Sequence, residues 1–164
     1  MSEETGEETG KDTGQRFLVD LMLMRLGRWL RLLGQDVACP TGERDEELLC
    51  QAKEERRTII TRDKRLFLAA PGAGISCLLI RSSNIYDQLL EMAKAGVPLR
   101  LDPQRCTVCN GRLQEVKTLG IDRWQCSACK KLYWEGGHWQ KMENMLQSIR
   151  SQIEENALPS NSRR

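Results

Sequence analysis

Four cysteines in the last third of the chain are spaced as metal ligands. Cys106 and Cys109 form one C-x2-C pair, Cys126 and Cys129 form a second, and sixteen residues separate the two pairs. One such turn brings two thiolates to one side of a metal, and a second turn completes a tetrahedron. The spacing lies within the range of zinc ribbons. Because four sulfur ligands leave no position for water or substrate, the predicted Zn²⁺ is structural.

Other readings of the cysteine module stay open at this point. A redox motif needs only one C-x2-C pair, so two pairs argue against it. Iron remains an alternative to zinc, because sequence does not separate the two metals in a four-cysteine cage. His138 either contacts phosphate or hydrogen-bonds within the ribbon. The neighbouring aromatic residues either stack on bases or form the small core of the ribbon: Trp124, Tyr133, Trp134 and Trp139.

Three aspartates in the first half of the chain are candidates for a second metal site. Asp20 ends an apolar run, Asp63 follows the β-branched run "TIIT", and Asp45 opens a helical pattern. The carboxyl ends of parallel strands share one sheet edge, where α/β proteins bind their ligands. Carboxylates gathered there would be neutralised by Mg²⁺ or Mn²⁺. Beside a phosphodiester, such ions activate water and stabilise the leaving oxygen.

Each acid also has a purely structural interpretation. Asp45 and Asp63 could have no role beyond capping the helices that follow them. Asp20 is harder to explain in that way, since an acid at the end of a buried strand is costly without a partner. Asp87 is a weaker fourth candidate, and a solvated position on a helix is the simpler explanation for it.

Basic residues near the same edge, and others in the ribbon, are candidates for phosphate contacts. Any one of them could equally be a solvated surface charge. The ribbon also offers Arg112 and Lys131. The predicted RNA-binding set is Arg28, Arg31, Arg62, Lys64, Lys130 and Trp134.

The segments that must position these residues alternate between short apolar runs and amphipathic helical patterns. We expect strands at 16–20, 35–39, 58–61 and 75–80, and helices at 21–34, 45–56, 62–70 and 84–96. This alternation predicts an α/β fold with a parallel sheet flanked by helices. A further helical pattern near the end of the chain carries Met142, Leu146 and Ile149 on one face.

Composition separates the ends of the chain from its body. Residues 1–15 carry five acids and one lysine, so the other residues carry a net charge of +6 against +2 for all 164. We expect residues 1–15 to be a disordered acidic tail without a secretory signal, and the body to be a cytoplasmic protein with reduced cysteines. No apolar run suggests a membrane span. The expected parts are 16–98, 103–140 as the ribbon, and 141–156 as a helix.

Several motifs occur together in one order: "FLVDLMLMRLGRWLRLLGQDV", "DEELLCQAKEERRTIITRDKRLF", the two C-x2-C pairs and "YWEGGHW". This pattern resembles the Mut-seven-C ribonuclease family over about residues 16–142. The resemblance implies a PIN-like nuclease domain at 16–98 fused to a zinc ribbon, with metal-dependent cleavage of RNA. It matches Asp20, Asp45 and Asp63 to the catalytic acids and the four cysteines to the zinc ligands. The chain departs from the family in "LMLM" at 21–24, where a glycine-bearing run is usual.

Two functions of different kinds follow from the sequence. The first is a metal-dependent ribonuclease, endonucleolytic by resemblance, in which Asp20, Asp45 and Asp63 hold Mg²⁺ or Mn²⁺ and RNA is the partner. The second is a non-catalytic scaffold that binds RNA or a ribonucleoprotein through the ribbon. The bulky "LMLM" run beside Asp20 favours the second function, and the presence of all three acids favours the first. An electron carrier with iron in the cysteine site is a third alternative.

Overall fold

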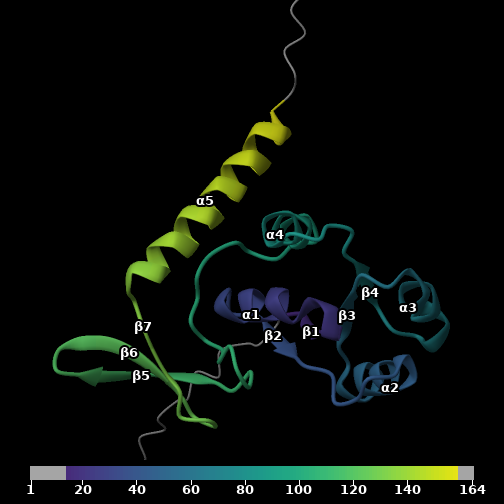
Figure 1. Cartoon of the computed structure of the whole chain (residues 1–164), viewed down its shortest axis with the longest axis horizontal. Helices are drawn as coiled ribbons and strands as arrows, with labels where there is room; N and C mark the ends of the chain where they lie inside the picture. The colour runs from purple at the N-terminus through teal and green to yellow at the C-terminus, as the bar shows by residue number, and fades with distance from the viewer. Residues whose placement is uncertain (1–13, 159–164) are drawn as a thin grey trace, which may run out of the picture.

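The structure is a computed structural model that describes residues 14–158, and the expected tail lies mostly outside this range. An α/β body is followed by a three-stranded ribbon and a long helix (Figure 1). The body contains β1 (Arg16–Val19), η1 (Leu21–Leu23), α1 (Met24–Leu32), β2 (Asp36–Ala38), α2 (Asp45–Glu55), β3 (Thr58–Thr61), α3 (Lys64–Ala69), η2 (Pro71–Ala73), β4 (Cys77–Leu79) and α4 (Ile85–Lys94). No helix among the described residues is long and apolar enough to cross a bilayer.

The body is built on a four-stranded parallel sheet in the order β2-β1-β3-β4. Leu18 of β1 pairs with Ile59 of β3, and Ile60 pairs with Leu78 of β4. The predicted α/β class is therefore confirmed, including the strict alternation of strands and helices. The fourth strand is shorter than expected, because only 77–79 of the apolar run 75–80 is extended as a strand.

Helices cover both faces of the sheet (Figure 1). Phe17, Val19 and Ile60 point into a cluster with α1, α4 and the last helix. Leu18 and Ile59 alternate to the opposite face and pack with residues of α2 and α3. Both sides of β1 and β3 are thus buried, which explains why residues 17–19 and 59–60 are apolar without alternation.

Helix α1 lies close against the sheet because of a glycine. A Cβ built at Gly27 would meet a methyl group of Val19 at 3.0 Å. The helix begins later than expected, since residues 21–23 form a separate 3-10 turn. Buried Leu23, Leu26 and Leu30 hold it on the core. Arg25 and Arg28 remain exposed on its outer side.

The ribbon consists of β5 (Leu113–Thr118), β6 (Ile121–Cys126) and β7 (Leu132–Trp134) in one antiparallel sheet. Leu119 and Gly120, both with positive φ, join β5 to β6 in a two-residue turn. Helix α5 (Gly137–Ala157) then crosses back to the body. Its buried Leu146 and Ile149 belong to the same core cluster as α1 and α4.

Candidate functional site

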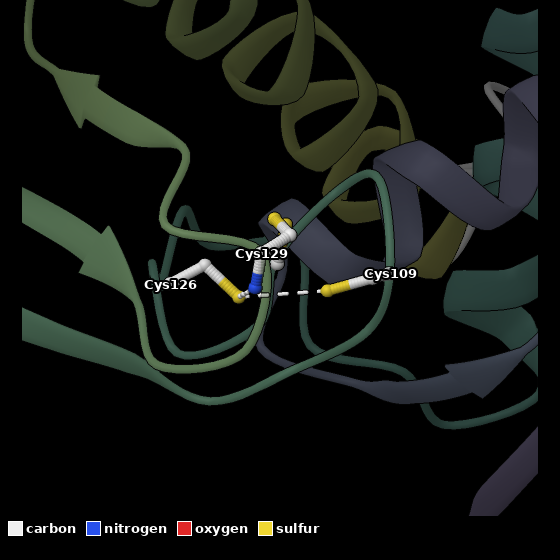
Figure 2. Close-up of side chains that lie close together, drawn as sticks. Cys109, Cys126 and Cys129 are labelled. Carbon is white, nitrogen blue, oxygen red and sulfur yellow. Dashed lines mark hydrogen bonds between the residues drawn. The ribbon is translucent and has the colours of Figure 1, made fainter.

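The four predicted zinc ligands converge on one point. The Sγ atoms of Cys106, Cys109, Cys126 and Cys129 all lie within 4.8 Å of one another. Figure 2 shows the sulfurs of Cys109 and Cys126 directed toward each other, at 3.5 Å. The Sγ atoms of Cys106 and Cys129 are 3.6 Å apart. Sulfurs about 2.3 Å from a tetrahedral zinc would be separated by about 3.8 Å. The cluster thus has the donor set and the spacing of a structural zinc site.

Two turns of the same design hold the sulfurs. In the first, Asn110 donates its N–H to the carbonyl of Cys106, and the N–H of Cys106 binds the carbonyl of Gly111. In the second, Lys130 and Lys131 take the corresponding places around Cys126. Asn110 and Lys130 have φ values of 63° and 64°, a conformation that asparagine adopts more readily than lysine.

A layer outside the sulfurs fixes their positions. The hydroxyl of Tyr133 lies 3.0 Å from Cys106 Sγ and accepts the N–H of Thr107 at 3.2 Å. Burial, with the hydrogen bond to Cys106, raises the pKa of Tyr133 to about 12, so the phenol stays protonated. Gly111 has no room for a side chain, because its Cβ would lie 2.8 Å from Cys126 Sγ.

The ribbon is joined to the body through Asn110. Its side-chain oxygen accepts the N–H of Val37 in β2 at 3.1 Å, and its amide nitrogen donates to Asp36 at 2.7 Å. Arg31 donates to the carbonyl of Val37 at 2.8 Å and to that of Thr107 at 2.8 Å. Val37 lies on an edge strand of the sheet, and its outward-facing N–H and carbonyl thus both have hydrogen-bond partners.

This joint corrects one sequence expectation. Arg31 is predicted to bind RNA, but it is only 2% exposed. Its guanidinium donates hydrogen bonds to backbone carbonyls of the body and of the ribbon. We therefore assign Arg31 to the contact between the body and the ribbon. Asp36 forms the centre of the same network, with Arg57 at 2.7 Å. Burial alone would raise the pKa of Asp36, but the hydrogen bonds from Arg57 and Asn110 outweigh it and lower that pKa.

Two of the predicted catalytic acids follow β1 and β3 at the carboxyl edge of the sheet, and Thr61 links the segments that carry them. The hydroxyl of Thr61 donates to Asp20 Oδ2 at 2.8 Å and accepts the N–H of Asp63 at 3.0 Å. Thr61 is fully buried, so it fixes the distance between the two segments. Asp63 also caps α3, because its Oδ1 accepts the N–H groups of Arg65 and Leu66. The capping interpretation of Asp63 is therefore correct, and the cap still leaves Asp63 Oδ2 for other contacts.

Asp45 is placed differently from the other two acids. It is an exposed first residue of α2, where Arg44 occupies the cap position. Within residues 14–158, the four cysteines form the only group of three or more His, Cys, Asp or Glu side chains placed to hold one metal ion, so the three aspartates do not form such a group. Asp87, the weaker candidate, lies in the first turn of α4 and accepts an N–H⋯O bond from the side chain of Asn84.

The predicted RNA-binding residues divide between two cavities and the surface. Arg62 and Lys64 line a cavity of about 450 Å³ at the carboxyl edge, together with Arg81. Arg28 and Trp134 line a second cavity between α1, the ribbon and α5. Lys130 is exposed on the second cysteine turn and donates to the carbonyl of Ser127. The structure thus brings together Arg62 with Lys64, and Arg28 with Trp134.

Cys77 in β4 has a pKa that responds to Asp20. Burial in β4, followed by the charge of Asp20, raises the pKa of Cys77 to about 11. A protonated, half-buried thiol is a poor nucleophile.

Sequence reasoning missed Thr61 and Asn110, and it named Tyr133 only as an aromatic residue for base stacking or for the core of the ribbon, without its contact to Cys106. Thr61 carries the only weak signal, because it is the polar end of a β-branched strand and precedes Asp63 by two residues. The roles of Asn110 and Tyr133 depend on contacts with segments 26 or more residues away. No local pattern reveals such contacts.

Comparison with known proteins gives one match. No curated protein and no solved structure matches the chain. The sequence model described as "Mut7-C RNAse domain" matches residues 15–146, which include the whole body, the ribbon and the first half of α5. At the level of this family the match indicates ribonuclease activity, with RNA as the substrate. The predicted resemblance is confirmed, and this chain belongs to the Mut7-C RNAse domain family.

Proposed function

We propose that the protein is a metal-dependent ribonuclease that cleaves RNA internally at the carboxyl edge of the parallel sheet. The observation that carries this proposal is the Asp20–Thr61–Asp63 arrangement in a chain of the Mut7-C RNAse domain family. There the buried hydroxyl of Thr61 binds the carboxylate of Asp20 and the backbone N–H of Asp63, which joins the segments that follow β1 and β3. We place the reaction inside the cell, where the cysteines stay reduced.

The acids fit Mg²⁺ or Mn²⁺ as donors. Mg²⁺ keeps several waters and is usually bound through one or two carboxylates plus substrate phosphates, so Asp20 and Asp63 suffice as its protein ligands. A bound divalent ion supplies an activated water and charge stabilisation for the leaving oxygen. Asp45, matched by motif, is the third acid of the proposal and would reach the site through water or substrate.

The surrounding residues suit a polyanion. Arg62 and Lys64 flank Asp63 in sequence and line the adjacent cavity with Arg81. These cations would hold the phosphates on either side of the scissile bond, and Asp20 and Asp63 would hold the divalent ion beside the reacting phosphate. The ribbon then acts as a second RNA contact, and its own metal, which we propose to be zinc, has only a structural role.

The test compares cleavage of end-labelled RNA by wild type, Asp20→Asn and Asp63→Asn. Asparagine caps helices as well as aspartate does, so Asp63→Asn keeps the start of α3 and removes only the charge. We expect each variant to lose more than about 100-fold in rate, because even the outer partners of metal ligands are worth about 10–100-fold. Asp122→Asn, an exposed acid on β6, is the matched control. For Asp45→Asn we expect a smaller loss.

Metal dependence needs care because chelators also attack the cysteine site. Zinc-loaded protein should be assayed without added divalent ions, then with Mg²⁺ or Mn²⁺ restored, and its zinc content checked after each step. Cleavage that requires the restored ion while zinc stays constant supports the proposal. Cleavage that survives in Asp20→Asn and Asp63→Asn would reject this acid site.

The scaffold function keeps one observation in its favour. Leu21 and Met22, directly after Asp20, are 48% and 67% exposed, so apolar side chains stand beside the proposed metal site. RNA binding without cleavage by wild type under every metal condition would establish the scaffold. Replacing 21–24 with a glycine-bearing run would then be expected to restore cleavage if bulk is the cause.

A further inference from the structure

A cavity of about 460 Å³ lies where the body, the ribbon and α5 meet. One wall is the outer side of α1, and the others come from the first cysteine turn, β7 and the start of α5. Its volume falls within the range of about 300–1,000 Å³ that is usual for pockets of small ligands. The cavity is separate from the carboxyl-edge cavity, and the two have no lining residue in common.

The charges around this cavity are all of one sign. Arg25 and Arg28 lie one turn apart on the exposed side of α1, and Lys131 faces them from the ribbon. Among the described residues that line the cavity there is no aspartate or glutamate. Three cations without a counter-charge at the rim favour an anionic ligand.

The remaining walls are aromatic and held in place. Trp139 stacks on Trp124, with ring centroids 5.9 Å apart and an interplanar angle of 5°. Tyr133 is fixed by its hydroxyl contacts with Cys106 and Thr107. Trp134, in contrast, is 61% exposed at the cavity. A large exposed ring beside fixed rings offers a stacking surface that no part of the described chain covers.

We propose that this cavity receives one unpaired nucleotide of a single-stranded RNA, with the base against Trp134 and the adjoining phosphates at Arg25 and Arg28. The proposal rests on the proposed ribonuclease function and specifies the form of RNA that it takes. Aromatic side chains stack on bases that are splayed out of a helix, whereas the bases of an A-form duplex are stacked on each other. An unpaired segment therefore fits the cavity and a continuous duplex does not.

The position of α1 connects this cavity to the acids. Asp20 precedes the helix by four residues, and Arg25 lies in its first turn. The lining residues of α1 extend from Arg25 to Leu32, about 10 Å along the axis, away from the carboxyl edge. One RNA strand could thus lie along α1 from the acids to the ribbon. The cavity would then select strands that remain unpaired beside the scissile bond.

Binding, measured apart from cleavage, tests the proposal. The full zinc-loaded chain carrying Asp63→Asn would be titrated into a fluorescein-labelled single-stranded oligonucleotide and into a blunt duplex of the same sequence, by anisotropy. We expect Trp134→Ala to weaken single-strand binding by about tenfold or more with an unchanged salt dependence. Arg28→Ala should weaken it and lower the slope of log K against log salt by about one.

Matched controls lie on the far hairpin. Leu119→Ala removes an apolar side chain that is 94% exposed, and Lys117→Ala removes an exposed charge of β5. Neither should change single-strand affinity by more than about twofold. Thermal melting and zinc content must match across the variants, so that a folding defect is not read as lost binding.

Any of three results would overturn the inference. The first is equal affinity for duplex and single strand, and the second is equal single-strand affinity in Trp134→Ala and Leu119→Ala. The third is displacement of the RNA by poly-glutamate at matched charge, which would indicate that the cavity binds an acidic peptide. None of these depends on cleavage. If wild type cuts RNA and Trp134→Ala binds normally, the cavity proposal fails alone. If nothing cuts but the binding differences appear, the nuclease proposal fails alone.

Discussion

The body and the ribbon are stabilised by different means. In the body, two apolar clusters fill both faces of the sheet, and large apolar residues of β1, β3 and α1 are fully buried, among them Phe17, Ile60 and Leu30. Within residues 102–136, only Cys106 and Cys126 are buried. The ribbon therefore has no apolar core of its own, and four sulfurs take the place of one. We therefore expect loss of a cysteine ligand to destabilise the ribbon, and loss of a buried apolar side chain to destabilise the body.

Removing a sulfur should have the largest effect. Cys106→Ser is expected to abolish stoichiometric metal binding and to unfold the ribbon, because structural zinc contributes about 10–16 kcal/mol to folding in small modules. Far-ultraviolet circular dichroism should still report the helices of the body. Metal analysis of wild type checks the premise: one zinc per chain supports it, while a coloured iron protein would indicate an electron carrier. If the ribbon stays folded without metal, the claim that its cysteine site replaces an apolar core is wrong.

Truncation of a buried apolar residue should instead lower the stability of the body. Leu146 of α5 is fully buried in the core cluster with α1 and α4. Leu146→Ala is expected to lower the free energy of unfolding by about 2–5 kcal/mol without changing zinc affinity. Urea denaturation and zinc titration measure the two quantities. Leu119→Ala, at the tip of the ribbon hairpin, makes the same change at an exposed site and should cost almost nothing.

The joint between the regions should respond to charge and pH. Asp36→Asn keeps the shape of the side chain but removes the charge that faces Arg57, and we expect it to cost about 1–3 kcal/mol. Because the pKa of Asp36 in the folded chain lies below its ordinary value of 3.8, the unfolded chain takes up the proton first. The contribution of Asp36 is present above about pH 4 and is lost as pH falls through the folded pKa.

Urea denaturation between pH 6 and pH 3 measures this contribution. The acid-induced loss of stability should be shallower in Asp36→Asn than in wild type. Arg16→Ala is the matched partner change, since Arg16 contacts Asp36 from an exposed position and should cost under about 1 kcal/mol. Parallel pH curves for wild type and Asp36→Asn would contradict the assignment.

The smallest expected effect concerns packing against the metal site. In Gly111→Ala the new methyl group would approach Cys126 Sγ to 2.8 Å and Cys109 Sγ to 3.2 Å. We expect zinc affinity to fall by about tenfold, or about 1.4 kcal/mol, in a competition with a chromogenic chelator. Gly72→Ala adds the same methyl group in open space on the body. An unchanged affinity in Gly111→Ala would show that the cysteine turns adjust freely.

The sequence predicts well those features that depend on local periodicity or on ligand spacing. The alternation of strands and helices is sufficient for the parallel sheet, and two C-x2-C pairs are sufficient for the cysteine cluster. The same reasoning does not predict the position of Arg31. Local periodicity places Arg31 on a polar helix face, but its side chain turns inward because the distant carbonyl of Thr107 accepts its hydrogen bond. The start of α5 at Gly137 is also missed, since two glycines carry no helical signal.

The acids show the same division. Asp20 directly follows β1, and Asp63 lies two residues after the neighbouring parallel strand β3, so topology alone brings both acids to one edge. Asp45 follows a loop after the edge strand β2, and a loop sets its distance from the sheet in a way that spacing does not encode. The motif identifies Asp45 by its place in the sequence, whereas the fold leaves it exposed at the start of α2.

The Asn110 contact has a consequence for how the protein behaves in solution. Strand β2 is an edge of the sheet, and its outward N–H and carbonyl at Val37 are occupied by Asn110 and Arg31. An uncovered edge strand is a template for pairing with another chain. Asn110 stays in place only while the first cysteine turn is folded. If the four cysteines hold a metal, we expect that metal to protect the body against self-association, and we expect metal-starved protein to aggregate through β2 before the core of the body melts.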